Sequence, residues 1–360
     1  MSDALDHIAA SRLRNQKLLR TDTRAPEAVV SWLGAVQAQD YPGARWALGR
    51  RATGSTDAGI ARACDEGRIL RIHILRPTWH FVSPADIRWM LSISGPRVNA
   101  INAHYYKKTG LDAPVFARSR RIIEKALGAG THLTRLELAA ALERSGIQAE
   151  GQRLAYLMMR GELDGVICSG ACRGKQFTYA LLDQRAPLTR TPSMKRDEAL
   201  AALATRYFTS HGPATLPDYV WWSGLMVKDA RGGIDAAGGA LRQETIDGRV
   251  HWLADSGPAR TKPSSSLHLL PNYDEYLIAY KDRQSIRDRR AAPANPLEFP
   301  YYLVIDGKLR GTWKRSARAG RVVIELRLYR PLAPGERRAL DAEAARYAKF
   351  VGSEVEVDTK

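Results

Sequence analysis

The chain has 360 residues, of which 44% are apolar and 26% charged, the composition of an ordinary globular protein. That length is too great for one simple core and indicates two to four structural units. Lys and Arg number 55 against 38 Asp and Glu, so the formal net charge is +17 and a polyanionic partner is the first hypothesis. A generally basic proteome or a requirement for solubility is the alternative explanation.

The cysteines and the apolar runs narrow the class of protein further. Cys64, Cys168 and Cys172 are too few for a disulfide framework and lack the spacing of a four-ligand zinc site, so we expect no metal. Charged residues precede any apolar run at the N-terminus, which predicts no signal peptide. No stretch approaches the roughly 20 apolar residues of a membrane helix. We therefore expect a cytoplasmic protein, associated with the nucleoid, without membrane contact.

The first part of the chain has the pattern of three helices and a hairpin. An amphipathic helix with a basic outer face is predicted over residues 5–20, a second from Pro26 to about Gln37, and a third over 57–66, ending at Gly67. Residues 68–82 alternate apolar and polar side chains, which predicts a two-stranded ribbon. This order is that of a winged helix, which we assign to residues 1–112.

The same order recurs twice. Residues 113–190 contain predicted helices at 115–127, 134–145 and 152–163 and a hairpin at 165–182, and Thr134 with Glu137 forms a capping box. Residues 191–265 contain predicted helices at 194–210, from Leu216 and near Ile234, then a strand pair around an Asp247-Gly248 turn. We interpret the three segments as structural repeats with little sequence identity.

The last part of the chain is rich in strands. A Ser/Pro/Gly-rich linker at 255–266 precedes predicted strands at 267–270, 276–280, 301–305, 309–314 and 322–329, with an Asp306-Gly307 hairpin and a final helix at 336–350. Residues 280–330 hold 13 Lys or Arg against 5 Asp or Glu, a local excess of 13 − 5 = +8. The predicted fold class is therefore α+β, with three tandem winged helices and a C-terminal β-rich basic region at 266–360.

Two amides stand out near the start of the chain. The apolar face of the second predicted helix runs into Gln37 and Gln39, one residue apart, and Pro42-Gly43 then forces a turn. We therefore expect both amides at a helix end, where a rigid element presents them to a ligand. On the pattern alone, solvated amides at a helix terminus are the more common case.

Basic and aromatic residues are interleaved along the chain. Lys and Arg neutralise phosphates and release counterions, which predicts salt-sensitive nucleic-acid binding. For Trp46, Trp79 and Trp313 we favour a core position. The candidate phosphate contacts are Arg45, Arg76, Lys281, Arg283, Lys314, Arg315 and Arg318, the last three on a predicted hairpin.

A second polar constellation lies at the start of the C-terminal region. His268-Leu269-Leu270-Pro271 is followed by Asn272-Tyr273-Asp274-Glu275-Tyr276, which places two carboxylates close to a histidine on a predicted strand. A core histidine with its hydrogen bonds satisfied is the alternative to a functional one. The sequence contains no Gly-rich phosphate loop of recognised spacing and no His-Glu-x-x-His zinc helix.

These motifs together resemble those of a bacterial family. The resemblance is to the AlkZ-like and YcaQ-like winged-helix DNA glycosylases, and it covers most of the chain. Gln39 matches the AlkZ-like Gln-Φ-Gln branch, since the YcaQ-like branch has Asp at that place. The motifs are Gln37-Ala38-Gln39 with 44–47, Arg76–Val82, Trp221–Leu225, His268–Pro271 with 274–276, and Gly311-Thr312-Trp313.

The resemblance implies a fold and an activity. The fold would be three tandem winged helices forming a concave basic surface. The activity would be hydrolysis of the N-glycosidic bond of N7-alkylated purines in duplex DNA, by a monomeric, monofunctional enzyme that needs no cofactor and leaves an abasic site. Gln37 and Gln39 would position water and stabilise charge on the sugar, and His268 and Pro271 would shape the opposite wall.

Several alternatives stay open at this point. The lesion could be a methyl adduct, a bulky natural-product adduct or an interstrand crosslink, and the role could be base-excision repair or self-resistance to a genotoxic antibiotic. A winged-helix transcription regulator is the main rival, although such regulators are usually short and dimeric. A damage sensor without catalysis is a third possibility, which the presence of both glutamines disfavours.

Overall fold

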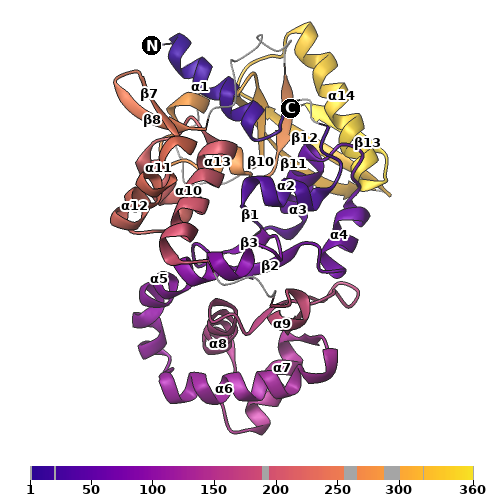
Figure 1. The fold of residues 1–360 in the computed structure, drawn as a ribbon. Helices are drawn as coiled ribbons and strands as arrows, with labels where there is room; N and C mark the ends of the chain where they lie inside the picture. The colour runs from indigo at the N-terminus through magenta and orange to yellow at the C-terminus, as the bar shows by residue number, and fades with distance from the viewer. Residues whose placement is uncertain are drawn as a thin grey trace.

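The computed structural model describes residues 2–19, 22–188, 194–254, 266–287, 301–318 and 320–359 (Figure 1). The first winged helix has its sheet in the order β1-β3-β2, with all pairs antiparallel. Its elements are α2 (Pro26–Leu33), β1 (Ala35–Gln37), α3 (Tyr41–Arg51), α4 (Asp57–Asp65), β2 (Leu70–His73) and β3 (Trp79–Val82).

The segment around the glutamines differs from the prediction. The helix predicted to reach Gln37 ends at Leu33, because Gly34 takes a left-handed φ of +82° and turns the chain into β1. Pro42 and Gly43 do not break a helix; they open one. Proline suits the first turn of α3, where its missing N–H has no partner to lose, and Asp40 caps that turn by accepting from the Gly43 nitrogen at 3.3 Å. Gln37 therefore lies on a strand, and Gln39 in the connection to α3.

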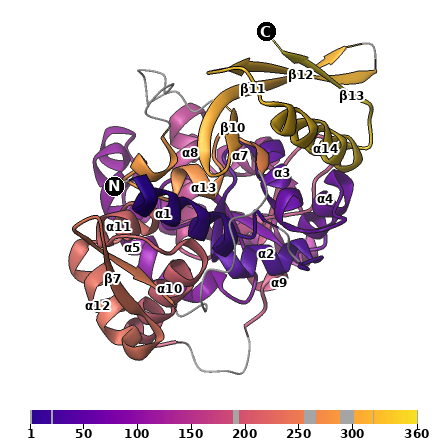
Figure 2. The ribbon, with the colours of Figure 1, turned by 90° about the horizontal axis from the view of Figure 1, so that it is seen from above.

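The first predicted helix also lies elsewhere than expected. α1 (Ser2–Asn15) is not part of the first winged helix; it packs against α10 and the short helix η3 (Gln284–Ile286), as Figure 2 shows. Its predicted basic outer face is wrong for Arg12, which is buried. The Arg12 guanidinium donates to the Pro213 carbonyl at 2.9 Å and lies 3.6 Å from the Tyr280 ring centroid.

The winged-helix order recurs in the second and third repeats, as predicted. In the second, strand order β4-β6-β5 reproduces β1-β3-β2, and in the third an isolated bridge from Ala214 to Trp252 takes the place of the first strand. The elements of the second are α6 (Ala113–Ala126), η1 (Gly128–Gly130), β4 (Leu133–Thr134), α7 (Arg135–Arg144), α8 (Gly151–Leu163), β5 (Ile167–Ser169), β6 (Thr178–Leu181) and α9 (Leu182–Arg185). Those of the third are α10 (Arg196–His211), α11 (Leu216–Ser223), α12 (Val227–Ala237), η2 (Gly238–Ala240), β7 (Arg242–Ile246) and β8 (Arg249–Leu253).

The predicted capping box and the predicted hairpin turns are confirmed. Thr134 and Glu137 form the capping box, and the Asp-Gly pairs at 247–248 and 306–307 both have positive φ at each residue, as tight hairpins require. A long helix, α5 (Ile87–Lys108), which was not predicted, joins the first two repeats (Figure 1). The predicted boundaries at 190–191 and the linker over 255–265 lie outside the described residues.

The C-terminal region is a five-stranded sheet covered by one helix. The strand order is β13-β12-β11-β10-β9, antiparallel except for the β12–β13 pair. The strand predicted at 276–280 is wrong: Asp274 caps a short helix there by accepting from the Tyr276 nitrogen at 2.9 Å. The elements are β9 (Leu267–Leu270), α13 (Glu275–Ile278), β10 (Tyr301–Ile305), β11 (Lys308–Arg318), β12 (Arg321–Leu328), α14 (Pro334–Val351) and β13 (Val355–Thr359).

The cores show which units are joined. The second winged helix has a core of its own, whereas the first shares one core with the C-terminal sheet and another with the third winged helix. Trp46 and Trp313 are core residues as predicted, and their indole nitrogens donate to the carbonyls of Leu269 and Leu270 at 2.6 and 3.0 Å. Three segments distant in sequence are therefore packed rigidly around β1.

Candidate functional site

Gln37 is held in a polar junction between three units. It lies opposite His80 in the β1–β3 ladder and is 8% exposed. Its backbone nitrogen donates to Glu275 Oε1 at 2.8 Å, and its side-chain Oε1 accepts from Arg76 Nη2 at 3.4 Å. Gln37 is thus held at its backbone nitrogen and at its side-chain oxygen by residues of other elements.

Gln39 occupies the more open side of the same region. The Ala38 nitrogen donates to the Trp79 carbonyl at 2.7 Å, which extends the pairing with β3 by one residue beyond Gln37. The Trp79 nitrogen in turn donates to Gln39 Oε1 at 3.4 Å, and the Gln39 side chain is exposed. The two predicted catalytic amides therefore flank the start of β3, one buried and one accessible.

Glu275 is the residue that the sequence reasoning missed. It is fully buried, and its second oxygen, Oε2, accepts from Trp222 Nε1 at 2.9 Å and lies 3.5 Å from His211 Nε2. Burial lowers the pKa of His211, and the hydrogen bond with Glu275 opposes that shift. Glu275 thus ties Gln37 to α10 and α11 of the third winged helix. The dense polar run after His268 was the available signal, but the sequence does not say which carboxylate contacts which partner.

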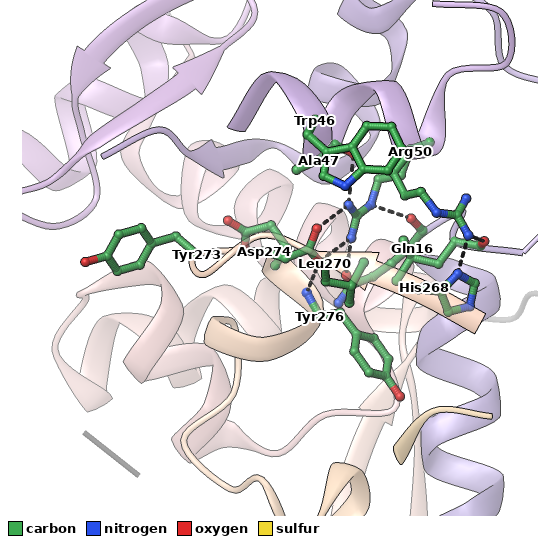
Figure 3. A network of polar contacts seen from close by, with 12 residues as sticks. Gln16, Trp46, Ala47, Arg50, His268, Leu270, Tyr273, Asp274 and Tyr276 are labelled. Atoms are coloured by element: carbon green, nitrogen blue, oxygen red, sulfur yellow. Dashed lines mark hydrogen bonds and ion pairs between the residues drawn. The ribbon is translucent and has the colours of Figure 1, made fainter. Parts of the chain in front are cut away.

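The neighbouring carboxylate anchors helix α3. Asp274 and Arg51 form a two-pronged ion pair at 2.7 Å on each side, with both side chains buried (Figure 3). Arg51 also donates to Gln16 Oε1 at 3.0 Å. All donors and acceptors of this pair are satisfied. The pair therefore fixes α3 against α13, and with α3 it fixes the segment from β1 to α3 that contains Asp40.

Arg76 is half-buried next to Gln37. Besides its bond to Gln37, its Nε is buried without a partner in the described part of the chain. Burial lowers the pKa of Arg76, and the nearby Glu275 charge opposes that shift. The loop that carries Arg76 packs against the end of α11: a Cβ on Gly224, which has φ +68°, would come within 2.4 Å of the Leu75 carbonyl oxygen. This contact explains the glycine in the Trp221–Leu225 motif.

His80 completes the buried side of the site. Its Nδ1 lies 2.9 Å from the Thr78 carbonyl oxygen, and Nε2 has no partner among the residues that the structure describes. Burial, with the Arg76 charge next, moves the pKa of His80 well below its usual range. The imidazole beside Gln37 is therefore neutral at physiological pH.

The structure places His268 in the interior, next to helix α3. It is 2% exposed, on β9, and its Nδ1 contacts Arg50 Nη2, whose Nε pairs with Glu343 at 2.5 Å (Figure 3). Burial and the Arg50 charge move its pKa well below the usual range. His268 is buried against α3, because every residue of β9 is buried, and its Nε2 has no hydrogen-bond partner among the described residues. Pro271 borders the start of α3, where a Cβ added to Gly43 would lie 3.1 Å from Pro271 Cβ.

The other predicted phosphate contacts lie in different settings. Arg45 pairs with Asp57 at 3.0 Å and Arg283 is half-buried, whereas Lys281 is exposed. On β11, Lys314, Arg315 and Arg318 are exposed as predicted; Lys314 and Arg318 both approach Glu325, at 3.2 and 3.4 Å. Of the seven predicted residues, Arg76 alone contacts one of the glutamines.

The described residues show neither a metal-binding cluster nor a membrane-spanning helix. They contain no cluster of three or more His, Cys, Asp or Glu side chains arranged to hold a metal ion. None of the helices that the structure describes combines the length and apolarity needed to cross a bilayer.

Comparison with known proteins identifies the family. A search of curated proteins found no match. A solved structure of the Streptomyces sahachiroi DNA glycosylase AlkZ is similar in fold, with a TM-score of 0.79 over 99% of each chain and 21% sequence identity. The family model described as DNA glycosylase AlkZ-like matches residues 30–350, which include Gln37, Gln39 and Glu275. Since that match covers most of the chain, the protein belongs to the AlkZ-like DNA glycosylase family.

Proposed function

We propose that this glycosylase hydrolyses the N-glycosidic bond of N7-alkylated purines in duplex DNA and leaves an abasic site. The observation that carries the proposal is the chemistry of the side chains around Gln37. Two carboxylates near the amides are already committed: Glu275 to Gln37, Trp222 and His211, and Asp40 to Tyr301 and the cap of α3. The amides of Gln37 and Gln39 and the guanidinium of Arg76 are left to face the substrate.

Such a site suits a substrate that is already activated. Cleavage between C1′ and N9 develops an oxocarbenium-like sugar and a departing base. Alkylation at N7 gives guanine a positive charge, so the base leaves as a neutral molecule without a general acid. The enzyme then has to place water and stabilise the sugar charge, and oriented amide dipoles do both.

We assign each amide a distinct role in this reaction. Gln37 Oε1 has two lone pairs, and the long 3.4 Å contact with Arg76 engages one of them, which leaves the other for water. Gln39, at the exposed side, would contact the sugar or the same water. A carboxylate base would be stronger, since general-base catalysis contributes about 10²–10⁴-fold. Weaker catalysis would protect undamaged guanine, whose base is a poor leaving group.

Binding of DNA would use the exposed basic residues beyond the site. Lys314, Arg315 and Arg318 on β11 and Lys281 after α13 are exposed, and we propose that they contact phosphates. Each neutralised phosphate adds to the salt dependence of affinity. We propose a monomer that acts on chromosomal DNA in the cytoplasm.

A cleavage assay tests the activity. A duplex with one 7-methylguanine is incubated with the enzyme and then heated in mild alkali, which cuts the strand at an abasic site. We expect cleavage by the wild type, at least a tenfold loss for Gln37→Ala or Gln39→Ala, and no cleavage of an unmodified duplex. Binding of the lesion duplex without cleavage would instead indicate a sensor or a transcription regulator. Equal rates for the wild type and the double alanine variant would refute the role of the amides.

Two extensions address selectivity and the lesion. Gln39→Asp should speed excision of 7-methylguanine and raise excision of unmodified guanine above the wild-type level; attack by the wild type on normal DNA would contradict the selectivity argument. Parallel duplexes with a bulky N7 adduct or an N7 interstrand crosslink separate general repair from self-resistance to a crosslinking antibiotic.

A further inference from the structure

The wing of the second winged helix reaches across to the glutamine motif. Its strand β5 lies against β2, where the Arg71 nitrogen donates to Ser169 Oγ at 2.8 Å. Further along the wing, the Cys172 nitrogen donates to Asp65 Oδ1, at the end of α4, at 2.7 Å. The wing is therefore fixed to the first winged helix at two positions, Ser169 and Cys172.

One aromatic side chain of this wing is both exposed and rigidly supported. Phe177 is 45% exposed, and its ring packs edge-on against Tyr41, with centroids 4.9 Å apart at 85°. The Arg71 guanidinium lies 4.9 Å from the same ring centroid. An edge contact and a cation on one part of the ring leave its remaining surface open to solvent.

The support of Phe177 leads directly to the site. Arg71 Nε donates to the carbonyl of Ala38, between the two glutamines, at 3.0 Å, and its guanidinium also lies 4.4 Å from the Trp79 ring. Tyr41 follows Gln39 by two residues and begins α3. Phe177 is thus joined to the Gln37-Ala38-Gln39 segment through one arginine and one tyrosine.

Other exposed apolar side chains of the described chain lack this combination. Trp221 is 44% exposed, but its indole nitrogen donates a hydrogen bond to the Ile278 carbonyl at 2.9 Å. Val250, 48% exposed on the wing of the third repeat, is aliphatic and has no ring to stack. Phe177 is also preceded by the exposed Arg173 and Lys175, so the wing tip is basic as well as aromatic.

We propose that Phe177 stacks on a nucleobase of the substrate next to the alkylated purine and thereby holds the lesion's sugar against Gln37 and Gln39. The inference rests on the proposed function, because it assumes a DNA substrate at the glutamines. DNA presents the π-faces of its bases and the negative charge of its phosphates. The fixed ring of Phe177 can stack on a base, and the basic residues of the wing suit the phosphates. Aromatic side chains on which bases stack are a general means of holding unpaired DNA.

The test combines substitutions with a fluorescent base. A duplex carries 2-aminopurine beside a 7-methylguanine, or beside a stable abasic-site analogue that cannot be cleaved. Stacking of Phe177 on the neighbouring base changes the 2-aminopurine emission when the wild type binds. Phe177→Ala should abolish that change and lower kcat/KM by about 5- to 150-fold, the range measured for loss of one base–aromatic stack.

Matched variants separate stacking from structure. Phe177→Trp should retain the fluorescence change and most of the activity, whereas Phe177→Leu, which preserves the apolar contact with Tyr41 but has no π-face, should lose both. Val250→Ala, an exposed apolar change on another wing, should leave both unchanged. Thermal unfolding of the four variants reports whether any loss comes from a damaged fold.

The outcomes also separate this inference from the proposed function. If wild type and Phe177→Ala excise 7-methylguanine equally and give the same emission, the inference is wrong and the function stands. If the wild type excises nothing, the function is wrong, and the emission with the abasic-site analogue still decides whether Phe177 stacks. Equal activity of Phe177→Leu and wild type would likewise overturn a stacking role.

Discussion

Glu275 accepts a hydrogen bond from the backbone nitrogen of Gln37 at 2.8 Å, although 238 residues separate the two in the chain. The same carboxylate contacts Trp222 of α11, so one buried charge joins the C-terminal region, the first winged helix and the third. A charge buried at 0% exposure is stable only while its donors are in place. The position of the candidate catalytic amide therefore depends on the docking of three units.

Replacing Glu275 by Gln tests this dependence. Glu275 faces three N–H groups, and the new side-chain amide would turn its own N–H donors toward one of them, where no hydrogen bond can form. We therefore expect a loss of about 2–4 kcal/mol in the free energy of unfolding, measured in urea. We also expect slower excision by the protein that remains folded. Glu343→Gln is the matched control, since Glu343 is buried in a pair with Arg50 away from the glutamines. It should lose similar stability but keep the excision rate of the folded enzyme.

Arg76 should act on turnover and not on DNA affinity. Arg76→Met keeps the length of the side chain but removes the donor to Gln37 Oε1, so we expect kcat to fall by about 100-fold, the low end for loss of one positioned donor. Single-turnover rates at saturating enzyme and equilibrium binding at several salt concentrations measure the two effects. A change confined to the binding constant would place Arg76 among the phosphate contacts.

Lys314→Gln should show the opposite behaviour. Lys314 is 73% exposed on β11, and loss of one phosphate contact weakens binding and lowers the slope of log K against log salt by about 1. The rate at saturation should not change. An unchanged salt slope would remove β11 from the DNA-binding surface.

The buried histidines predict a loss of stability in mild acid. Burial lowers the pKa of His80, His211 and His268 in the folded protein, while each takes a proton near pH 6.5 when unfolded. The unfolded state then binds more protons, so this stability is present above pH 6.5 and is lost as the pH falls below it, by up to about 1.4 kcal/mol per pH unit for each histidine. Urea unfolding between pH 5 and 7.5 measures the slope.

Substitutions of single histidines show which of them contribute to the slope of unfolding free energy against pH. His80→Gln should reduce it by the share of one histidine, whereas His104→Gln, at an exposed position, should leave it unchanged. An equal slope in the wild type and His80→Gln would show that His80 does not contribute.

Gly224 tests the contact between α11 and the Arg76 loop. Gly224→Ala brings a Cβ to within 2.4 Å of the Leu75 carbonyl oxygen, and the backbone has φ +68°. Gly248→Ala has the same left-handed cost at φ +72°, with no atom within 4 Å of the new Cβ. We expect about 1 kcal/mol of destabilisation for Gly248→Ala and about 2–4 kcal/mol for Gly224→Ala, with a loss of excision for Gly224→Ala only. Thermal or urea unfolding and the cleavage assay compare them.

The sequence by itself determined the features that depend on neighbouring residues. The Thr134–Glu137 capping box, the two Asp-Gly turns and the alternation of β2 and β3 each use side chains within a few positions of one another, and each was read correctly. The threefold recurrence of helices and hairpins followed from the same local signals. Gln37 and Gln39 were identified by motif and resemblance, and their catalytic role stays a prediction.

The tertiary structure decided what those residues contact. Local pattern placed Gln37 on a helix, because an apolar run reads the same way until Gly34 turns it, and placed a strand at 276–280, where Asp274 caps a helix. Arg12 and His268 looked like a surface cation and a site residue, yet both are buried against partners more than 200 positions away. Periodicity reports which face of an element is apolar, but pairing among buried charges depends on how separate elements dock, and only the folded chain fixes that.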